Sequence, residues 1–343
     1  MNVELYFDKK SEWLEARRTL GIGSSDAAAI LGISRYKSAF QLFQEKLGVM
    51  PASKNETELL EWGNILEEPI AQRYSMETNR RVINPNVTQD GARVFTIIRS
   101  QSVDFQIAQV DRFVEKLPDQ GENPEEDRDF GVLEIKNAHF FVGKSWLDEQ
   151  EPPLEFTVQL QHQLAVTGKQ WGSIAALIGG CRFVWGDIAR DNEFIELLTK
   201  AEDEFWERLK RNEAPPPDGS EWTAKTLAKL FPGENGQIIP APIEAVDWHV
   251  ELAKAKQQEK DVLATRGQME NRIKAAIGEN TGIRLPDGTI YTWKTQRRRE
   301  FVSKATTFKV LRLTEARKPE LPAGTVTPLQ LGDMQRDAEE CDQ

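Results

Sequence analysis

The sequence predicts an α/β fold in which helices surround a central mixed β-sheet, and two observations lead to this prediction. Apolar residues recur at helical spacing through the N-terminal third of the chain and again over 155–167. Between and after these stretches the pattern changes to short apolar runs typical of strands, as at 131–136 and 173–178. We therefore expect one sheet, with helices packed around it.

The N-terminal third is predicted to be helical. A first helical stretch around Trp13 leads into a flexible turn at 21–26, which contains serine and aspartate, both strong helix caps. The helices expected after this turn cover 27–31, 40–48 and 56–78.

The middle of the chain has the pattern of strands. Strands are expected over 94–98, over 105–110 with 112–114 as its continuation, over 131–136 and over 173–178, with 183–185 as a hairpin partner of the last. An acidic stretch at 119–129 is expected to be a solvated loop. Two further helices are expected over 155–167 and 192–210.

A domain boundary is expected near Pro217, because the prolines at 215–217 cannot continue the preceding helix. The sequence thus predicts a domain over 1–217 and a C-terminal extension over 218–343. The extension should contain a long helix at 245–278, a hairpin around 286–288 and an acidic tail. The hairpin lies in a basic segment, 284–318, which contains ten basic and three acidic residues.

Composition excludes several classes of protein. Hydrophobic residues make up 39% and charged residues 29% of the 343 residues, as in a globular chain. No apolar run reaches the roughly 18 residues of a membrane span, and no signal peptide is recognisable, so a cytoplasmic protein with no membrane contact is expected. Two cysteines, Cys181 and Cys341, and three histidines argue against a disulfide framework or a Cys/His zinc site.

The net charge of −11 argues against a protein that coats nucleic acid by bulk charge. It is compatible with a nuclease, in which an acidic metal site and local basic contacts coexist.

The strongest chemical signal is Asp111 followed by Glu134 and Lys136. Side chains alternate along a strand, so Glu134 and Lys136 share a face, and Asp111 would approach from a neighbouring strand. Two carboxylates suit a hard cation such as Mg²⁺, and the carbonyl of Ile135 could add a ligand. The metal would polarise the scissile phosphate and the attacking water, and the lysine could orient or help deprotonate that water.

An isolated Glu-x-Lys triplet is more often a solvated strand edge than a catalytic motif. The apolar neighbours of Glu134 favour a core strand instead, where a metal site would resolve the cost of buried charge. Two adjacent carboxylates without a metal repel each other. Removal of either Asp111 or Glu134 is therefore expected to keep or raise the metal-free melting temperature.

Further polar residues suggest phosphate or metal contacts, each with a simpler alternative. Arg17 and Arg18 precede Ser25, which opens a helix suited to phosphate, although Ser25 could be a plain cap. Gln159 shares a helix face with His162 and Gln163, but these could be a polar helix surface. Glu67 could reach a metal, although solvated helix acids are common.

These segments, in this order, resemble the YqaJ-type viral recombinase family, to which lambda exonuclease belongs, within the PD-(D/E)XK nuclease superfamily. The matching segments are 17–32, Trp62-Gly63 with Glu67, 108–114, 134–136, and Gln159 with 161–163. The resemblance covers about 10–220 and implies a restriction-endonuclease-like core with a central mixed sheet.

The resemblance also implies roles for individual residues. Asp111 and Glu134 would be metal ligands together with the carbonyl of Ile135, Lys136 would be the catalytic lysine, and Glu67 would support the metal site. Asp104 is a rival to Asp111, which is preferred because the run after it keeps the family's form. Ser25, Gln159 and either Arg17 or Arg18 would bind the 5′-phosphate of DNA.

The function implied is a Mg²⁺-dependent exonuclease, with Mn²⁺ as a substitute metal. It would degrade one strand of linear duplex DNA from its 5′ end and leave a 3′ overhang. A single-strand annealing protein as partner, a homo-oligomer such as a trimeric ring, and the cytosol of a bacterium or phage-infected host are further expectations. An endonuclease or repair nuclease with the same metal core, or a catalytically silent DNA-binding or scaffold protein, remain alternatives.

Overall fold

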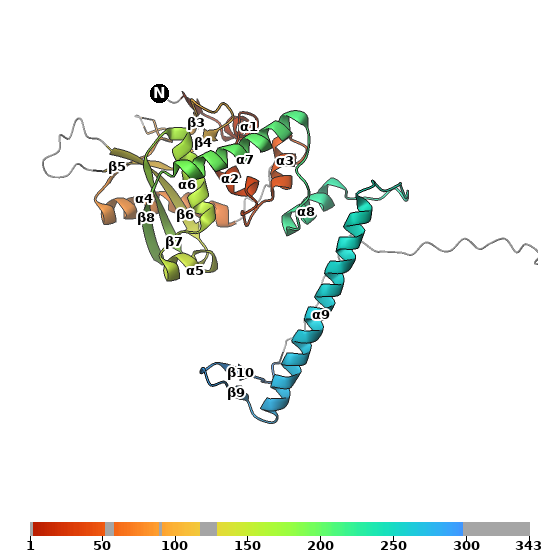
Figure 1. Cartoon of the computed structure of the whole chain (residues 1–343). Coiled ribbons are helices and arrows are strands. Elements are labelled where there is room, and N and C mark those ends of the chain that lie inside the picture. Colours follow the sequence, from red (N-terminus) through yellow and green to blue (C-terminus); the bar gives the residue numbers. More distant parts are fainter. Residues whose placement is uncertain (1–2, 52–57, 89–90, 117–128, 298–343) are drawn as a thin grey trace, which may run out of the picture. The chain divides into compact units, whose positions relative to one another are not determined.

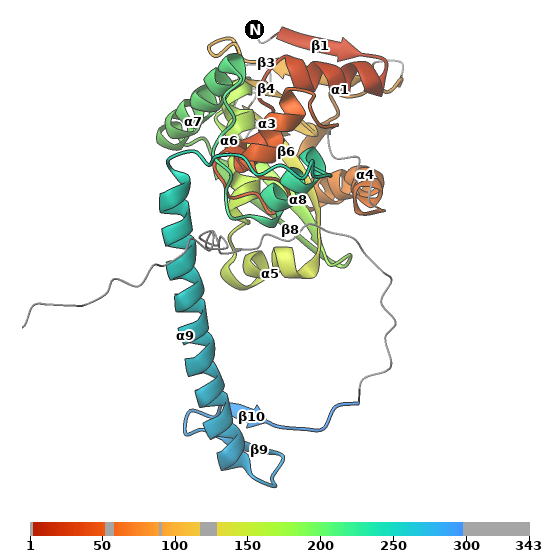
Figure 2. The same cartoon turned by 90° about the vertical axis from the view of Figure 1, so that its right-hand side faces the viewer.

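The computed structural model describes residues 3–51, 58–88, 91–116 and 129–297. The chain divides into two compact units, Met1–Gln237 and Ile238–Gln343, which Figures 1 and 2 show from two sides. The acidic stretch expected at 119–129 lies outside the described residues except for its last residue. The acidic tail and most of the basic segment lie outside them as well.

The first unit contains the expected mixed sheet. Its five strands run in the order β2-β5-β6-β7-β8. Their bounds are Arg81–Ile83, Arg112–Lys116, Asp129–Ala138, Trp171–Ile178 and Arg182–Ala189. Strands β6 and β7 are parallel and the other neighbours are antiparallel, which confirms a mixed sheet. The parallel pair requires a crossover, and the helices α5 (Phe140–Glu149) and α6 (Leu154–Thr167) supply it.

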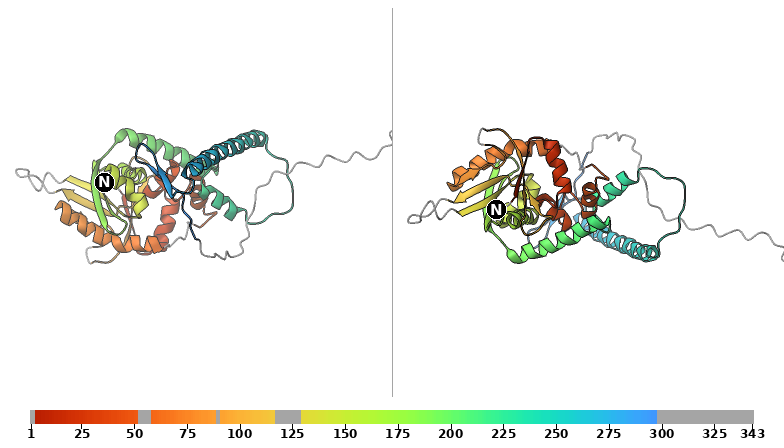
Figure 3. Two further views of the ribbon diagram at one scale, coloured as in Figure 1. Left: turned by 90° about the horizontal axis from the view of Figure 1, so that it is seen from below. Right: turned by 90° about the horizontal axis from the view of Figure 1, so that it is seen from above.

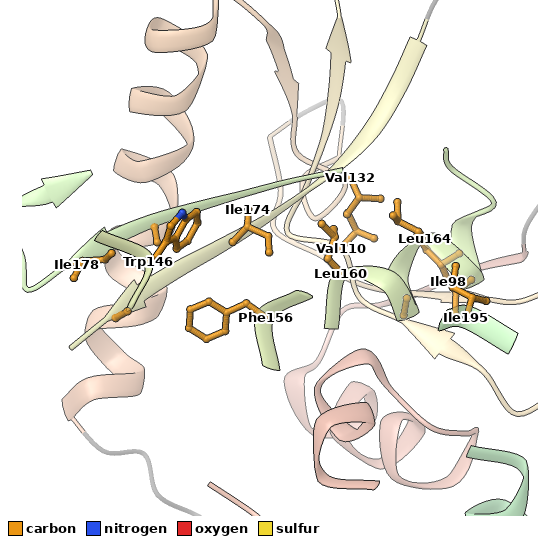
Figure 4. Packing of buried hydrophobic residues seen from close by; sticks show 14 residues of the cluster. Ile98, Val110, Val132, Trp146, Phe156, Leu160, Leu164, Ile174, Ile178 and Ile195 are labelled. Atoms are coloured by element: carbon orange, nitrogen blue, oxygen red, sulfur yellow. The ribbon is translucent and has the colours of Figure 1, made fainter. Parts of the chain in front are cut away.

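Alternation along β6 sends its side chains to two different cores. Val132 faces α6, where it packs with Leu160 and Leu164 in the cluster that Figure 4 shows. Leu133 faces the other way and packs against Tyr74 of α4 (Glu58–Thr78). Glu134 and Lys136 have the same parity as Val132 and therefore lie on the α6 face.

A further helix covers α6 on the side away from the sheet. Leu198 of α7 (Asn192–Arg211) packs against Val158 of α6. The views along the vertical axis accordingly show α4 and α7 on opposite sides of the strands (Figure 3). The helix α6 is thus held on both sides, with its polar residues toward β6.

The N-terminal elements form a second layer beside α6. A small antiparallel sheet has the strand order β1-β3-β4, with bounds Val3–Phe7, Phe95–Arg99 and Ile107–Ala108. The helices of this layer are α1 (Lys10–Thr19), α2 (Ser24–Ile30) and α3 (Ala39–Lys46). Helix α2 packs on α6, since Ala27 and Ala28 share a cluster with Val158.

The structure places the boundary between units after the one expected at Pro217. Helix α8 (Glu221–Leu230) belongs to the first unit, because Thr223 Oγ1 lies 2.8 Å from Ser38 Oγ and Trp222 donates to the Arg35 carbonyl at 2.8 Å. Helix α7 ends before the prolines, where Asn212 adopts the left-handed conformation as its C-cap, and the chain returns to the core after them.

The second unit is simple in its described part. Helix α9 (Ala245–Ile277) matches the long helix expected over 245–278. Strands β9 (Gly282–Arg284) and β10 (Ile290–Thr292) form the expected hairpin. No helix in the part of the chain that the structure describes has the length and apolar character needed to cross a bilayer.

Candidate active site

The site lies where β5 and β6 stop pairing. Their ladder ends at the pair Arg112 and Leu133, and beyond it β6 pairs only with β7. Asp111 precedes β5, and its Oδ2 accepts a hydrogen bond from the Ile135 N–H at 2.9 Å. Because the N–H and C=O of one strand residue point to the same edge, the Ile135 carbonyl opens toward Asp111 as well.

Glu134 is buried and fully engaged by neighbours from β6 and α6. Its Oε1 lies 2.6 Å from Lys136 Nζ and accepts from Gln159 Nε2 at 2.6 Å. Its Oε2 accepts from Gln163 Nε2 at 2.6 Å. Lys136 also donates to Gln159 Oε1 at 2.8 Å, so the Gln159 amide bridges the acid and the lysine.

The pKa values of Asp111 and Lys136 are both raised, for different reasons. Burial raises the pKa of the Asp111 carboxyl well above its usual range, and the nearby charges of Glu134 and Glu67 raise it further. Burial alone would lower the pKa of the Lys136 ammonium, but Glu134 outweighs burial and the pKa is raised. Lys136 is therefore a stable cation, whereas the surroundings of Asp111 favour the protonated, neutral form of its carboxyl.

Glu67 lies close enough to raise the Asp111 pKa, but its own partner is Arg112. The buried guanidinium of Arg112 contacts Glu67 and reaches Glu68 Oε2 at 2.8 Å. It also donates to the Asp111 carbonyl at 2.6 Å. Arg112 thus ties α4 to the start of β5 and fixes the backbone that carries Asp111.

The residues present fit a magnesium ion. No group of three His, Cys, Asp or Glu side chains in the described ranges is placed to hold a metal. Mg²⁺ suits such a site, since it keeps several waters and is commonly held by one or two carboxylates plus substrate phosphates. The negative charges of Glu134 and Glu67 around Asp111 favour a hydrated cation there.

The residues expected to bind phosphate lie in two separate groups, Arg17 with Ser25 and Gln159 with Glu134 and Lys136. Arg17 Nη2 donates to Ser25 Oγ at 2.9 Å. Arg18 instead pairs with Glu15 at 2.5 Å and donates to the Lys46 carbonyl at 2.8 Å. Gln159 lies with Glu134 and Lys136. The Arg17 guanidinium thus supplies a full positive charge beside Ser25, at the start of the seven-residue helix α2.

A close backbone contact fixes the segment between Arg17 and Ser25. Ile22 donates to the Phe105 carbonyl at 2.7 Å and accepts from the Ile107 N–H at 3.0 Å. A Cβ on Gly21 would lie 2.2 Å from the Phe105 oxygen, so only glycine fits there. The rival acid Asp104 is exposed in the turn before β4. Of these two aspartates, it is Asp111 whose side chain bonds to β6.

The sequence indicated no role for Arg112, and for Gln163 only a possible phosphate contact, not the contact with Glu134. Gln163 reaches both Glu134 and, at 3.1 Å, the Gln109 carbonyl. Both residues stand inside the quoted motifs, but a motif does not show which neighbour a polar side chain contacts. His162 is buried and bonds Glu202 at 2.7 Å and the Ile107 carbonyl at 2.9 Å.

Comparison with known proteins gives consistent matches. Residues 12–170 match the model of the YqaJ-like viral recombinase domain. The protein described as "Uncharacterized protein YqaJ" of Bacillus subtilis (strain 168) is 33% identical over 269 residues, which is 77% of each chain. That aligned stretch is longer than the first unit and so includes part of the second.

Two solved structures are also similar. One is the alkaline exonuclease LHK-Exo of Laribacter hongkongensis, with 20% identity and a TM-score of 0.45 over 65% of this chain and 100% of that chain. The other is a phage-related exonuclease of Haemophilus somnus 129PT, with 13% identity and a TM-score of 0.37 over 58% of this chain and 99% of that one. The identity to the Bacillus subtilis relative and its coverage decide the family: the chain belongs to the YqaJ-like viral recombinase family.

Proposed function

We propose that this protein is a Mg²⁺-dependent exonuclease that degrades one strand of linear duplex DNA in the 5′-to-3′ direction and leaves a 3′ overhang. The observation that supports this most directly is the meeting of Asp111, Glu134 and Lys136 at the end of the β5·β6 ladder. The family adds support, because its domain is that of a viral recombinase.

In this proposal Asp111, Glu134 and the Ile135 carbonyl hold Mg²⁺, with Mn²⁺ as a substitute. When bound, the metal polarises the scissile phosphate and lowers the pKa of the attacking water. Lys136 remains protonated, because Glu134 raises its pKa. It therefore orients the water and offsets negative charge that develops on the phosphate, and does not act as a base.

Gln159 and Gln163 act on Glu134 in the same mechanism. Their amide N–H groups hold both carboxylate oxygens at 2.6 Å. Hydrogen bonds of this kind orient a metal-binding carboxylate and are conserved features of working sites. Gln159 further fixes Lys136, so that acid and lysine keep one relative position during turnover.

Direction follows from the contact between Arg17 and Ser25. A terminal 5′-phosphate carries more charge than an internal one and has free oxygens, so a guanidinium beside a hydroxyl favours an end. Gln159 could reach a phosphate only from its place beside Glu134, at the edge of the metal site. An anchored 5′ end would present the next phosphodiester to the metal.

Several expectations extend beyond one chain. A single-strand annealing protein would take up the 3′ overhang, and the exonuclease would act as a homo-oligomer, such as a trimeric ring around DNA. The site of action would be the cytosol of a bacterium or of a phage-infected host. Each is a proposal that rests on the family.

One assay tests the function. The purified chain is incubated with a 5′-phosphorylated linear duplex and with a closed circular duplex, each in Mg²⁺ or EDTA. The proposal requires that the linear duplex is digested in Mg²⁺ but not in EDTA, and that the circular duplex stays intact. A 5′ label should be lost faster than a 3′ label. Cutting of the circle would indicate an endonuclease, and two intact substrates would indicate a silent binding protein.

A further inference from the structure

A buried lysine next to the proposed phosphate pocket makes three polar contacts at once. Lys46 Nζ, at the end of α3, lies 2.9 Å from Asp26 Oδ2, 2.9 Å from the Arg17 carbonyl and 2.5 Å from the Gly21 carbonyl. Its side chain is only 7% exposed. An ammonium has three N–H donors, so all three have acceptors here.

These contacts connect the two ends of the pocket. The Arg17 and Gly21 carbonyls belong to the segment that leads from α1 to Ser25, and Asp26 is in the first turn of α2. Asp26 Oδ2 also accepts the Gly23 N–H at 3.1 Å. One ammonium thus fixes the backbone of Arg17 relative to the helix that carries Ser25.

The charges support this arrangement. Burial alone would raise the pKa of the Asp26 carboxyl, but Lys46, Lys37 and Arg17 outweigh it and hold the pKa far below its usual range. Burial lowers the pKa of Lys46, and Asp26 opposes that effect. Asp26 is therefore ionised beside the cations Lys46, Lys37 and Arg17.

A buried ion pair is a weak source of stability, because the cost of removing two charges from water offsets their attraction. Such a pair can instead fix one geometry among several. The Arg80–Asp187 pair, with two contacts of 2.7 Å, is a more exposed ion pair of the same unit; Arg80 lies between α4 and β2, and Asp187 lies on β8.

We propose that Lys46 is a positioning residue that sets the Arg17 guanidinium against Ser25 and so determines the preference for 5′-phosphorylated ends. This inference rests on the proposed 5′-phosphate pocket and names the residue that maintains it. Lys46 itself does not touch the phosphate, since its three donors are in use.

The test is the variant Asp26→Asn/Lys46→Met. Asn keeps an acceptor for the Gly23 N–H, and Met keeps the length of the lysine stem, so no unpaired charge is buried. The matched control is Arg80→Met/Asp187→Asn, which removes a partly exposed ion pair elsewhere in the same unit. For wild type and both variants, KM and kcat are measured on 5′-phosphorylated and 5′-hydroxyl duplexes, with a melting curve for each protein.

We expect the first variant to raise KM for phosphorylated ends by about tenfold, the value of one charge-assisted hydrogen bond. Its kcat and its KM for hydroxyl ends should stay unchanged, as should the end preference of the control. A folded first variant with the wild-type end preference overturns the role of Lys46 alone. A wild type without any end preference overturns the phosphate pocket and this inference together.

If the double variant does not fold, Lys46→Arg takes its place. It keeps a cation beside Asp26, but a planar guanidinium cannot aim donors at all three acceptors. The end preference should fall in this variant too, and an unchanged preference would again overturn the role of Lys46.

Discussion

The carboxylate of Asp111 accepts the backbone N–H of Ile135 at 2.9 Å, just past the last pair of the β5·β6 ladder. A side chain therefore takes the place of a strand partner at this point. The same peptide segment carries Glu134, so the spacing of the two acids is set by backbone geometry and not by flexible side chains alone.

The first prediction concerns Asp111→Asn. Asn keeps an acceptor for Ile135 but removes a metal ligand worth several kcal/mol of transition-state stabilisation, so kcat should fall by about 10³-fold. In EDTA at neutral pH the variant should melt above wild type. The raised Asp111 pKa means that wild type loses stability as pH rises from the ordinary carboxyl range to that raised value, so the gap should close in acid. Equal melting temperatures at all pH values would contradict the argument.

The second prediction concerns the pH dependence of metal binding. Asp111 must lose a proton before it can bind a cation, and its pKa is raised by burial, Glu134 and Glu67. Mg²⁺ affinity should therefore increase with pH up to that raised pKa, with release of a proton. Calorimetric titration in two buffers of different ionisation enthalpy measures the release. Asp111→Asn, as a control, should bind weakly at every pH and release none.

The third prediction separates Glu134 from Asp111. Glu134→Ala leaves the Lys136 ammonium and two glutamine N–H groups without their acceptor, so it should destabilise the metal-free protein by about 3 kcal/mol. This corrects the expectation that the loss of either acid relieves repulsion, because Glu134 is paired with a cation. Urea unfolding in EDTA measures the effect. Glu134→Ala/Lys136→Ala should lose clearly less than the sum of its single variants, and simple additivity would exclude the coupling.

The fourth prediction distinguishes the two arginines. Arg17→Ala should reduce the preference for 5′-phosphorylated ends by about tenfold or more, since a charge-assisted bond contributes roughly 1.5–3 kcal/mol. Arg18→Ala should leave the preference intact, because Arg18 is engaged by Glu15 and the Lys46 carbonyl. Initial digestion rates on both kinds of end give the answer, and the reverse result would move the pocket to Arg18.

The fifth prediction concerns His162. Burial alone would lower its pKa, but Glu202 outweighs burial and the pKa is raised. The stability that the charged ring contributes is complete below the unfolded pKa of about 6.5 and is lost as pH rises through the folded value. His162→Gln should flatten this part of the curve of unfolding free energy against pH. The exposed His249 is the control, and His249→Gln should leave the curve unchanged.

Elements with a strong apolar period were predicted well from the sequence. The helix expected over 155–167 is α6 (Leu154–Thr167), and the strand expected over 173–178 lies within β7. Both are buried on a continuous face, so their patterns are strong. Strand β1 and helix α8 were not predicted, because β1 is mostly exposed and α8 buries little beyond Thr223 and Thr226.

Other errors arise from tertiary contacts. The strand expected over 105–110 is reduced to β4 (Ile107–Ala108), because Ile22 takes up the hydrogen bonds beside it. Trp62 and Leu66 stand four residues apart, the spacing of a core pair on a helix, but Trp62 is 48% exposed, and the core contacts of α4 begin with Leu66 and Ile70.

The site was predicted in part. Alternation along one strand is visible in the sequence, so the shared face of Glu134 and Lys136 follows directly. The partners of Lys46 include backbone carbonyls, which carry no sequence signature, and the choice between Arg17 and Arg18 depends on side-chain direction. Such features require coordinates.

The antiparallel register of β5 and β6 has a practical consequence for engineering. Arg112 pairs with Leu133 next to the acids, whereas Lys116 pairs with Asp129 at the opposite end of the ladder. The connection over 117–128 therefore leaves and re-enters the sheet at the end remote from Asp111 and Glu134. An affinity handle or a fluorophore inserted between Lys116 and Asp129 would therefore join the sheet at that remote end, and the spacing of the two acids should stay the same.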